Sequence, residues 1–158
     1  MRRVIGIGDA FVASGKEDFL ITHSLGSCIG IGIYDEKHNV GGILHYMLPF
    51  SSLDPEKARA NPLRFGDTGI PELFKKAYKF GAEKRNLRVV MAGGANVLNN
   101  QNLFDIGRRN VMIARKLFWK NRIMIDNEDV EGTAPRTLSL NMETGKFELQ
   151  SRGTKLEF

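Results

Sequence analysis

The chain has 158 residues, of which 42% are hydrophobic, a net charge of +5 and a single cysteine. A domain of this size buries a core without disulfides, and a lone cysteine forms none internally. No apolar run is long enough to span a membrane, and the stretch after Met1 is too short for a secretory signal. We therefore expect one domain, residues 1–158, in a reducing cytoplasm.

The excess of lysine and arginine favours acidic partners. These residues are scattered along the chain and lack the interleaved aromatic residues of a nucleic-acid stacking platform. Most of them are expected on solvated faces. The sequence therefore predicts neither nucleic-acid binding nor membrane insertion.

The first half of the chain reads as short strands joined by turns. From Cys28 to Tyr34 the residues alternate, so that Cys28 shares one face with Gly30 and Gly32 while isoleucines form the other. We expect the isoleucines to face the core and the glycines to leave room for close approach to the thiol. His45 follows a polar turn, on the returning strand. The strands predicted here are Val4–Ile7, Phe19–Thr22, Cys28–Tyr34 and Gly42–Leu48.

Residues 50–66 contain two prolines and read as a long irregular loop, of the kind that often forms a lid. A helix is predicted next, with Asp67 or Thr68 as its cap and Gly81 as its end. Its helically spaced apolar residues, expected in the core, are Ile70, Leu73, Phe74 and Ala77.

The second half contains a buried strand, a helix and a hairpin. The apolar run Leu87–Ala92 predicts a central strand, and an asparagine-rich loop follows it. Helical spacing predicts a helix over Ile106–Lys120, and Ile123–Ile125 starts another strand. Residues 136–150 alternate and turn at a Thr-Gly pair, as in a hairpin. The order predicts a mixed α/β fold without an internal repeat.

Cys28 and His45 supply the residue types of a thiol nucleophile and its base. A hairpin brings its two strands side by side, so these residues are candidate cross-strand neighbours, although the sequence does not fix the register. A purely structural role for both residues stays open at this point. His23, five residues before the cysteine, stays open as a competing base.

Other motifs near the cysteine fit less well. Gly26 to Gly30 match the nucleophile elbow, but an elbow leads into a helix and a strand is predicted here. Gly93 and Gly94 follow a strand without the lysine of a phosphate loop, which favours close packing. The three histidines and one cysteine lack metal-ligand spacing. We expect neither a metal nor a cofactor.

Seven motifs occur in the order seen in one protein family. They are Thr22, Leu25-Gly26-Ser27-Cys28, His45-Tyr46-Met47-Leu48-Pro49, Asp67-Thr68, Ala92-Gly93-Gly94-Ala95, Ile106-Gly107-Arg108-Arg109-Asn110 and Asn141-Met142-Glu143-Thr144-Gly145-Lys146. The pattern covers nearly the whole chain and resembles the CheD family of chemoreceptor glutamine deamidases.

The resemblance implies hydrolysis of glutamine side-chain amides in the cytoplasmic domain of methyl-accepting chemoreceptors, through a cysteine thioester. It implies Cys28 as nucleophile, His45 as base and Thr22 as the residue that orients the imidazole. The fold would be a three-layer α/β domain similar to the catalytic domain of cytotoxic necrotizing factor. The positions expected near the substrate and its oxyanion are Gly26, Ser27, Gly93 and Gly94.

The resemblance also implies binding to CheC, a phosphatase of the chemotaxis response regulator. A catalytically idle docking partner of CheC is therefore the alternative function, and transfer of the acyl group to an amine is a third. The chain departs from the family at Glu131–Pro135, where one glycine of a pair is replaced and a proline is added. We expect this loop to differ in shape.

Overall fold

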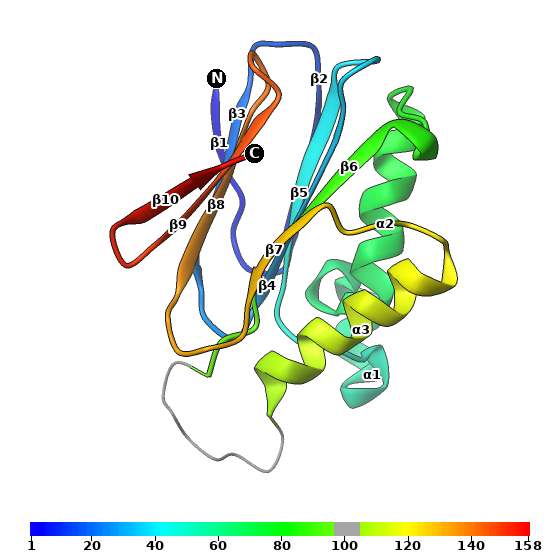
Figure 1. Cartoon of the computed structure of the whole chain (residues 1–158). Helices are drawn as coiled ribbons and strands as arrows, with labels where there is room; N and C mark the ends of the chain where they lie inside the picture. Colours follow the sequence, from blue (N-terminus) through cyan, green and yellow to red (C-terminus); the bar gives the residue numbers. More distant parts are fainter. Residues whose placement is uncertain (97–104) are drawn as a thin grey trace.

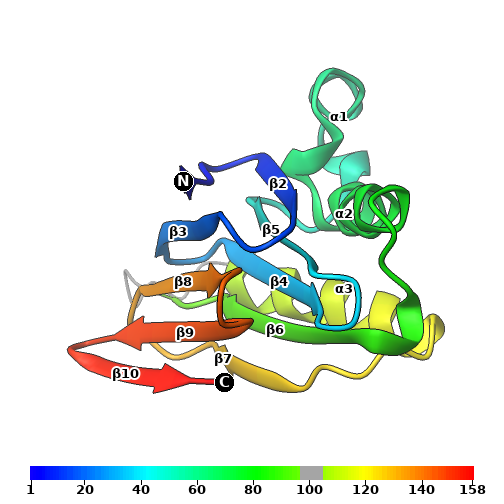
Figure 2. The same ribbon diagram turned by 90° about the horizontal axis from the view of Figure 1, so that it is seen from above.

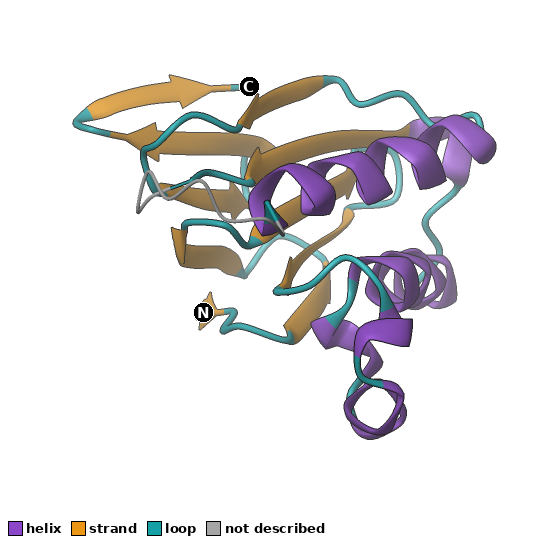
Figure 3. Cartoon of the chain, turned by 90° about the horizontal axis from the view of Figure 1, so that it is seen from below, coloured by secondary structure: helices purple, strands orange, loops and turns teal. Residues whose placement is uncertain are grey.

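Two five-stranded sheets and one layer of helices form three layers in the computed structural model, which describes residues 1–96 and 105–158 (Figures 1 and 2). The helices cover the face of the middle sheet that points away from the outer sheet (Figure 3). This arrangement confirms the predicted mixed α/β class. Within the described residues, no helix is long and apolar enough to cross a membrane.

The outer sheet has the strand order β1-β3-β8-β9-β10, in which only β1 and β3 run parallel. Its strands are β1 Arg2–Val4, β3 Phe19–Leu25, β8 Arg136–Asn141, β9 Lys146–Ser151 and β10 Thr154–Glu157. The middle sheet has the order β2-β5-β4-β6-β7, in which only β6 and β7 run parallel. Its strands are β2 Asp9–Ser14, β4 Ile29–Asp35, β5 Val40–Tyr46, β6 Leu87–Gly93 and β7 Asn127–Val130.

Within the described residues, the helical layer contains three α-helices, which short 3-10 turns connect. The α-helices are α1 Pro55–Ala60, α2 Gly66–Lys79 and α3 Ile106–Lys120. The 3-10 turns are η1 Ser51–Leu53, η2 Pro62–Arg64 and η3 Lys84–Asn86. Apolar residues of α2 and α3 pack on the middle sheet, as their helical spacing predicts.

Strand β4 lies at the centre of the molecule, and both of its faces are buried. Its isoleucines face the core, as predicted, and they pack against the helical layer. The glycines were expected to leave room for close approach on the thiol face, and at Gly30 and Gly32 it is the outer sheet that makes this approach. A Cβ atom on Gly32 would lie 2.4 Å from Cε1 of Phe147 on β9. The glycines of β4 therefore let the two sheets approach closely.

Several predicted boundaries move. Strand β2 was not predicted, because Asp9–Ser14 carries no strict alternation of polar and apolar residues. Ile123–Ile125 is not a strand, and the pairing begins later, in β7. Most of the asparagine-rich loop lies outside the described residues.

The segment 50–66 forms α1 and two 3-10 turns in place of an irregular loop. The Asp54 side chain caps α1 by accepting from the Lys57 N–H, and a proline opens the helix. Helix α2 begins at Gly66, ahead of the two predicted caps. Its Asp67 carboxylate instead accepts from the backbone and hydroxyl of Ser51, at 2.9 Å each.

Candidate active site

Thr22 and His45 meet between the two sheets. Thr22 lies on β3 of the outer sheet and His45 on β5 of the middle sheet, and both side chains are buried. The Oγ1 atom of Thr22 is 2.7 Å from Nδ1 of His45. This contact joins residues of different sheets, and it brings together the threonine and the imidazole that the family resemblance pairs.

The hydrogen bonds of Thr22 determine the tautomer of His45. A hydroxyl carries one hydrogen, and Thr22 donates it to the backbone oxygen of Ile5 at 2.7 Å. The Thr22 oxygen therefore accepts from His45, so that Nδ1 carries the imidazole proton and Nε2 carries the lone pair. The Nε2 atom is buried and has no hydrogen-bond partner within the described residues.

Burial keeps the imidazole uncharged. It lowers the pKa of His45 to about 4, because a buried imidazolium loses the solvation of its charge. His45 is consequently neutral at physiological pH. A neutral imidazole with an unpartnered Nε2 is a proton acceptor.

Cys28 immediately precedes β4. In the pairing of β4 with β5, Ile29 lies opposite Tyr46 and Gly30 lies opposite His45, so Cys28 shares a face with His45 at the next same-face position. Its side chain belongs to the core between the sheets and is 9% exposed. The prediction that the strands after Cys28 and around His45 are neighbours is therefore confirmed. Cys28 lies diagonally across from His45 and not directly opposite it.

The environment of Cys28 favours the protonated thiol. Burial raises the pKa of the Cys28 thiol above its ordinary value, and its own backbone N–H opposes that rise to a smaller extent. With His45 also neutral, the two groups rest as thiol and imidazole. The arrangement is therefore suited to proton transfer during nucleophilic attack, without a preformed thiolate.

The backbone after β6 holds the cysteine segment in place. The Gly94 N–H donates to the Cys28 oxygen at 2.9 Å, and the Ala95 N–H donates to the Gly26 oxygen at 2.8 Å. Gly93 has a φ of +112°, and a Cβ atom there would lie 2.1 Å from the Cys28 oxygen. The approach of the two backbones thus requires glycine at position 93, which supports the packing role predicted for this pair.

In the turn before Cys28, the backbone N–H of Gly26 is already engaged in a hydrogen bond and is not free to bind an oxyanion. The Gly26 N–H donates to the Ser24 oxygen at 2.9 Å. The Gly94 N–H, described above, is also engaged with a carbonyl. Ser27 is exposed beside the thiol. Of the four positions expected near the oxyanion, Gly26 and Gly94 contribute backbone shape rather than free N–H groups.

Asn110 on α3 lies at this site, although the sequence alone predicts no role for it. It is fully buried, and its Nδ2 donates to the Ser27 oxygen at 2.8 Å and to the Met47 oxygen at 2.9 Å. These bonds tie the residue before Cys28 to the end of β5. A buried asparagine at a helix position between apolar residues was the available signal, because such a group needs specific partners.

His23 lies apart from this arrangement. It follows Thr22 in β3, so its side chain points to the opposite face, and it is exposed. His45 is therefore the histidine that shares the buried face with Cys28. In residues 1–96 and 105–158, no cluster of three His, Cys, Asp or Glu side chains is arranged to hold a metal ion.

The divergent turn at Glu131 packs beside the same backbone. Glu131 has a left-handed φ of +65°, and its N–H donates to the Gly93 oxygen at 2.9 Å. Arg136 supports the turn through bonds to the Glu131 oxygen at 2.5 Å and to the Asp129 carboxylate at 3.2 Å. A residue other than glycine is thus held in a costly conformation by partners around it.

Comparison with known proteins gives consistent matches. A family model described as "CheD chemotactic sensory transduction" matches residues 47–151. A probable chemoreceptor glutamine deamidase CheD 1 of Syntrophus aciditrophicus is 49% identical over 97% of this chain and 96% of its own length. The corresponding protein of Solibacter usitatus is 45% identical over 98% of this chain and 91% of its own, and that of Thermococcus kodakarensis is 39% identical over 97% and 96%.

Among solved structures, the hypothetical protein YfiH of Bacillus licheniformis is similar over 79% of this chain and 50% of that chain, with 13% identity and a TM-score of 0.46. This likeness is too slight to support an argument about function. The family model begins after Cys28 and His45, whereas the three relatives above extend over nearly the whole chain.

Proposed function

The chain belongs to the CheD family, and on that premise we propose that it is a deamidase of protein glutamine side chains, with Cys28 as nucleophile and His45 as base. The observation that carries the proposal is the hydrogen bond from His45 to Thr22, which leaves the lone pair of Nε2 free on the face shared with Cys28. The names of the relatives supply the substrate class.

In the first half of the reaction, the Cys28 sulfur attacks the carboxamide carbon of the glutamine while its proton passes to Nε2 of His45. Thr22 accepts from Nδ1–H throughout and so stabilises the imidazolium that forms. His45 then returns the proton to the departing nitrogen, and the carbon–nitrogen bond breaks. The products of this half are ammonia and a thioester on Cys28.

In the second half, water attacks the thioester carbon and gives its proton to Nε2 of His45. The carbon–sulfur bond breaks, the proton returns to sulfur, and the substrate leaves as a glutamate. The oxyanion of each tetrahedral intermediate needs N–H donors. Because the Gly26 and Gly94 N–H groups are engaged, we assign this role to the backbone N–H groups of Ser27 and Cys28.

The proposed substrates are glutamines in the cytoplasmic domain of methyl-accepting chemoreceptors. We accordingly propose that residues 1–158 act as one deamidase domain in the cytoplasm. The three-layer arrangement agrees with the implied likeness to the catalytic domain of cytotoxic necrotizing factor, and that likeness is part of the proposal.

Mass spectrometry of a chemoreceptor cytoplasmic fragment from the same organism tests this function. We expect wild-type protein to convert specific glutamines to glutamates, and Cys28→Ala and His45→Gln to convert none detectably. His23→Gln is the matched histidine control, and we expect its rate to stay within about twofold of wild type because its side chain is exposed on the other face.

Loss of activity in His23→Gln with full activity in His45→Gln would reverse the assignment of the base. If the folded wild-type protein converts no glutamine, the deamidase proposal fails, and the alternative role of a docking partner for CheC gains support. Addition of a primary amine separates hydrolysis from transfer, because only transfer attaches the amine to the glutamine side chain.

A further inference from the structure

The exposed face of α3 carries positive charge and no negative charge. Between Ile106 and Lys120 the helix contains five basic residues and no acidic one, and all five are exposed. Only Arg115 among them has an ion-pair partner within the described residues, Glu128 on β7. The five residues are Arg108, Arg109, Arg115, Lys116 and Lys120.

These five residues account for the net charge of the molecule. The chain has 23 lysines and arginines and 18 aspartates and glutamates. Without the five of α3, the two kinds of charge are equal in number. The net positive charge of the chain therefore equals the charge of this one helix. From the sequence alone, the excess of lysine and arginine was expected to be spread over the solvated faces.

Two large apolar side chains interrupt this basic face. Met112 is 57% exposed, and Trp119, the sole tryptophan of the chain, is 81% exposed. They lie seven residues apart and so on the same side of the helix, between Arg108, Lys116 and Lys120. An exposed tryptophan within a charged rim is the usual composition of a protein–protein contact, in which tryptophan and arginine contribute most.

The same helix is fixed to the candidate active site. Asn110, in its second turn, donates to the backbone oxygens of Ser27 and Met47, which flank Cys28 and β5. A helix rises 1.5 Å per residue, so Trp119 lies about 14 Å along the axis from Asn110. The basic face thus runs outward from the site along a rigid element.

We propose that the exposed face of α3 is a docking surface for an acidic region of the protein substrate, with Trp119 inserted at an apolar position of that region. This proposal rests on the proposed deamidase function. Opposite charge on the substrate would raise the rate of encounter and align the chain that carries the glutamine. In this arrangement the active site binds the glutamine side chain, and α3 binds the folded protein that carries it.

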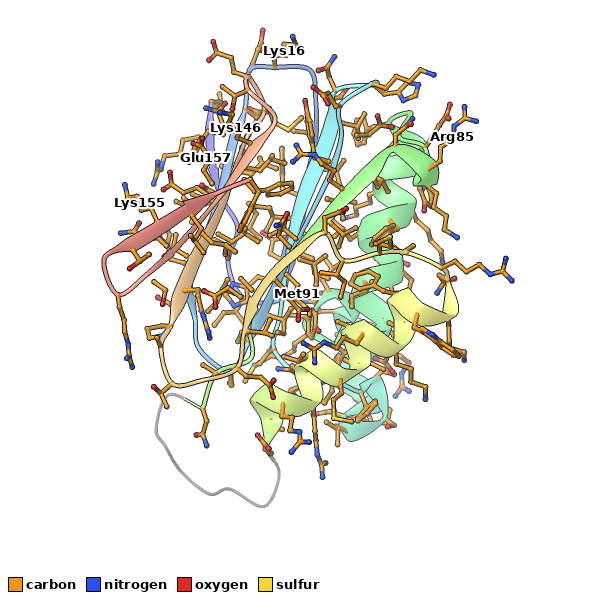
Figure 4. The ribbon with its side chains drawn as sticks, viewed as in Figure 1. Lys16, Arg85, Met91, Lys146, Lys155 and Glu157 are labelled. Atoms are coloured by element: carbon orange, nitrogen blue, oxygen red, sulfur yellow. The ribbon has the colours of Figure 1, made fainter. Side chains whose placement is uncertain are left out.

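Kinetic measurements on two substrates separate docking from chemistry. The substrates are the folded chemoreceptor cytoplasmic fragment and a short peptide that spans only a deamidated glutamine. The docking variants are Lys116→Glu/Lys120→Glu and Trp119→Ala. The matched control is Lys16→Glu/Lys37→Glu, which makes the same change in charge on exposed turns; Lys16 lies at the end of the molecule opposite the start of α3 (Figure 4).

For the folded fragment, we expect both docking variants to raise KM about tenfold with kcat within about twofold of wild type. The peptide should be processed equally by wild type and by all variants. The proposal is overturned if the docking variants leave KM for the fragment unchanged. It is also overturned if the control raises KM equally, since net charge alone would then be the cause.

Fluorescence of the single tryptophan tests docking without reference to activity. A fragment free of tryptophan should shift the emission of Trp119 to shorter wavelength, and high salt should reverse the shift. A shift without any deamidation would uphold the docking surface and reject the deamidase. A shift with phosphatidylglycerol vesicles but none with the fragment would identify a membrane-binding face and overturn the proposal.

Discussion

At the scale of the residue, the proposed mechanism gives Thr22 the position that an acidic group occupies in other catalytic triads. Because the Thr22 proton is committed to the Ile5 oxygen, its lone pair is the acceptor that holds His45 in the tautomer with a free Nε2. Thr22→Val keeps the shape and removes this acceptor. We expect kcat/KM for the chemoreceptor fragment to fall about 10- to 100-fold, the loss typical when the partner that orients a functional imidazole is removed.

Thr22→Ser restores the hydroxyl and is the matched control, which should stay within a few fold of wild type. Nitrogen NMR of His45 distinguishes positioning from a general loss of structure: the wild type should show one neutral tautomer, with Nδ1 protonated, and the valine variant a mixture. An unchanged tautomer in the valine variant would reject this role for Thr22.

The residue types of the site could be predicted from sequence to different extents. Cys28 and His45 stood out because the chain has one cysteine and the hairpin brings the two strands together. Thr22 came only from the family resemblance, since its contact crosses between sheets that are distant in the chain. Asn110 had no assigned role because its two acceptors are backbone oxygens from other elements.

At the scale of the element, the alternation of residues in β4 predicts which side chains share a face. It does not predict which layer of the molecule packs on each face. Period-two spacing separates isoleucines from glycines. Only the tertiary structure reveals that the outer sheet covers the glycines, with β3 and β8 against Gly30 and β9 against Gly32. Gly32→Ala places a methyl group against Phe147. We expect it to lower the free energy of unfolding by about 1 to 3 kcal/mol, the usual effect of overpacking, measured by urea denaturation.

Gly6→Ala is the matched control, because a Cβ atom there meets no atom within 4 Å. It should change the stability by less than about 0.5 kcal/mol. The double variant Gly32→Ala/Phe147→Leu should recover part of the loss, since the shorter side chain makes room. Equal stabilities of the two single alanine variants would contradict the close approach of the sheets at Gly32.

At the scale of the whole molecule, the burial of His45 makes the stability of the fold depend on pH. The folded state holds the pKa of His45 at about 4, against an ordinary value near 6.5. Below pH 6.5 the unfolded chain therefore binds a proton that the folded protein does not, and the fold loses stability as the pH falls toward 4. Above pH 6.5 both states are neutral at this group, and its contribution is constant.

Between pH 7 and pH 5 this linkage predicts a fall of about 2 kcal/mol in the free energy of unfolding. Burial raises the pKa of the Asp35 carboxyl, but hydrogen bonds from Glu83 and His38 outweigh this effect and lower the pKa. Asp35 therefore stays ionised between pH 7 and pH 5. In the His45→Gln variant the side chain at this position does not titrate. Its free energy of unfolding should therefore fall by about 2 kcal/mol less than that of the wild type between pH 7 and pH 5. Urea denaturation at both pH values measures the difference, and equal slopes in the two proteins would mean that His45 is accessible to protons in the fold. That result would contradict the proposal that His45 is buried and neutral at rest and accepts the proton of the Cys28 thiol.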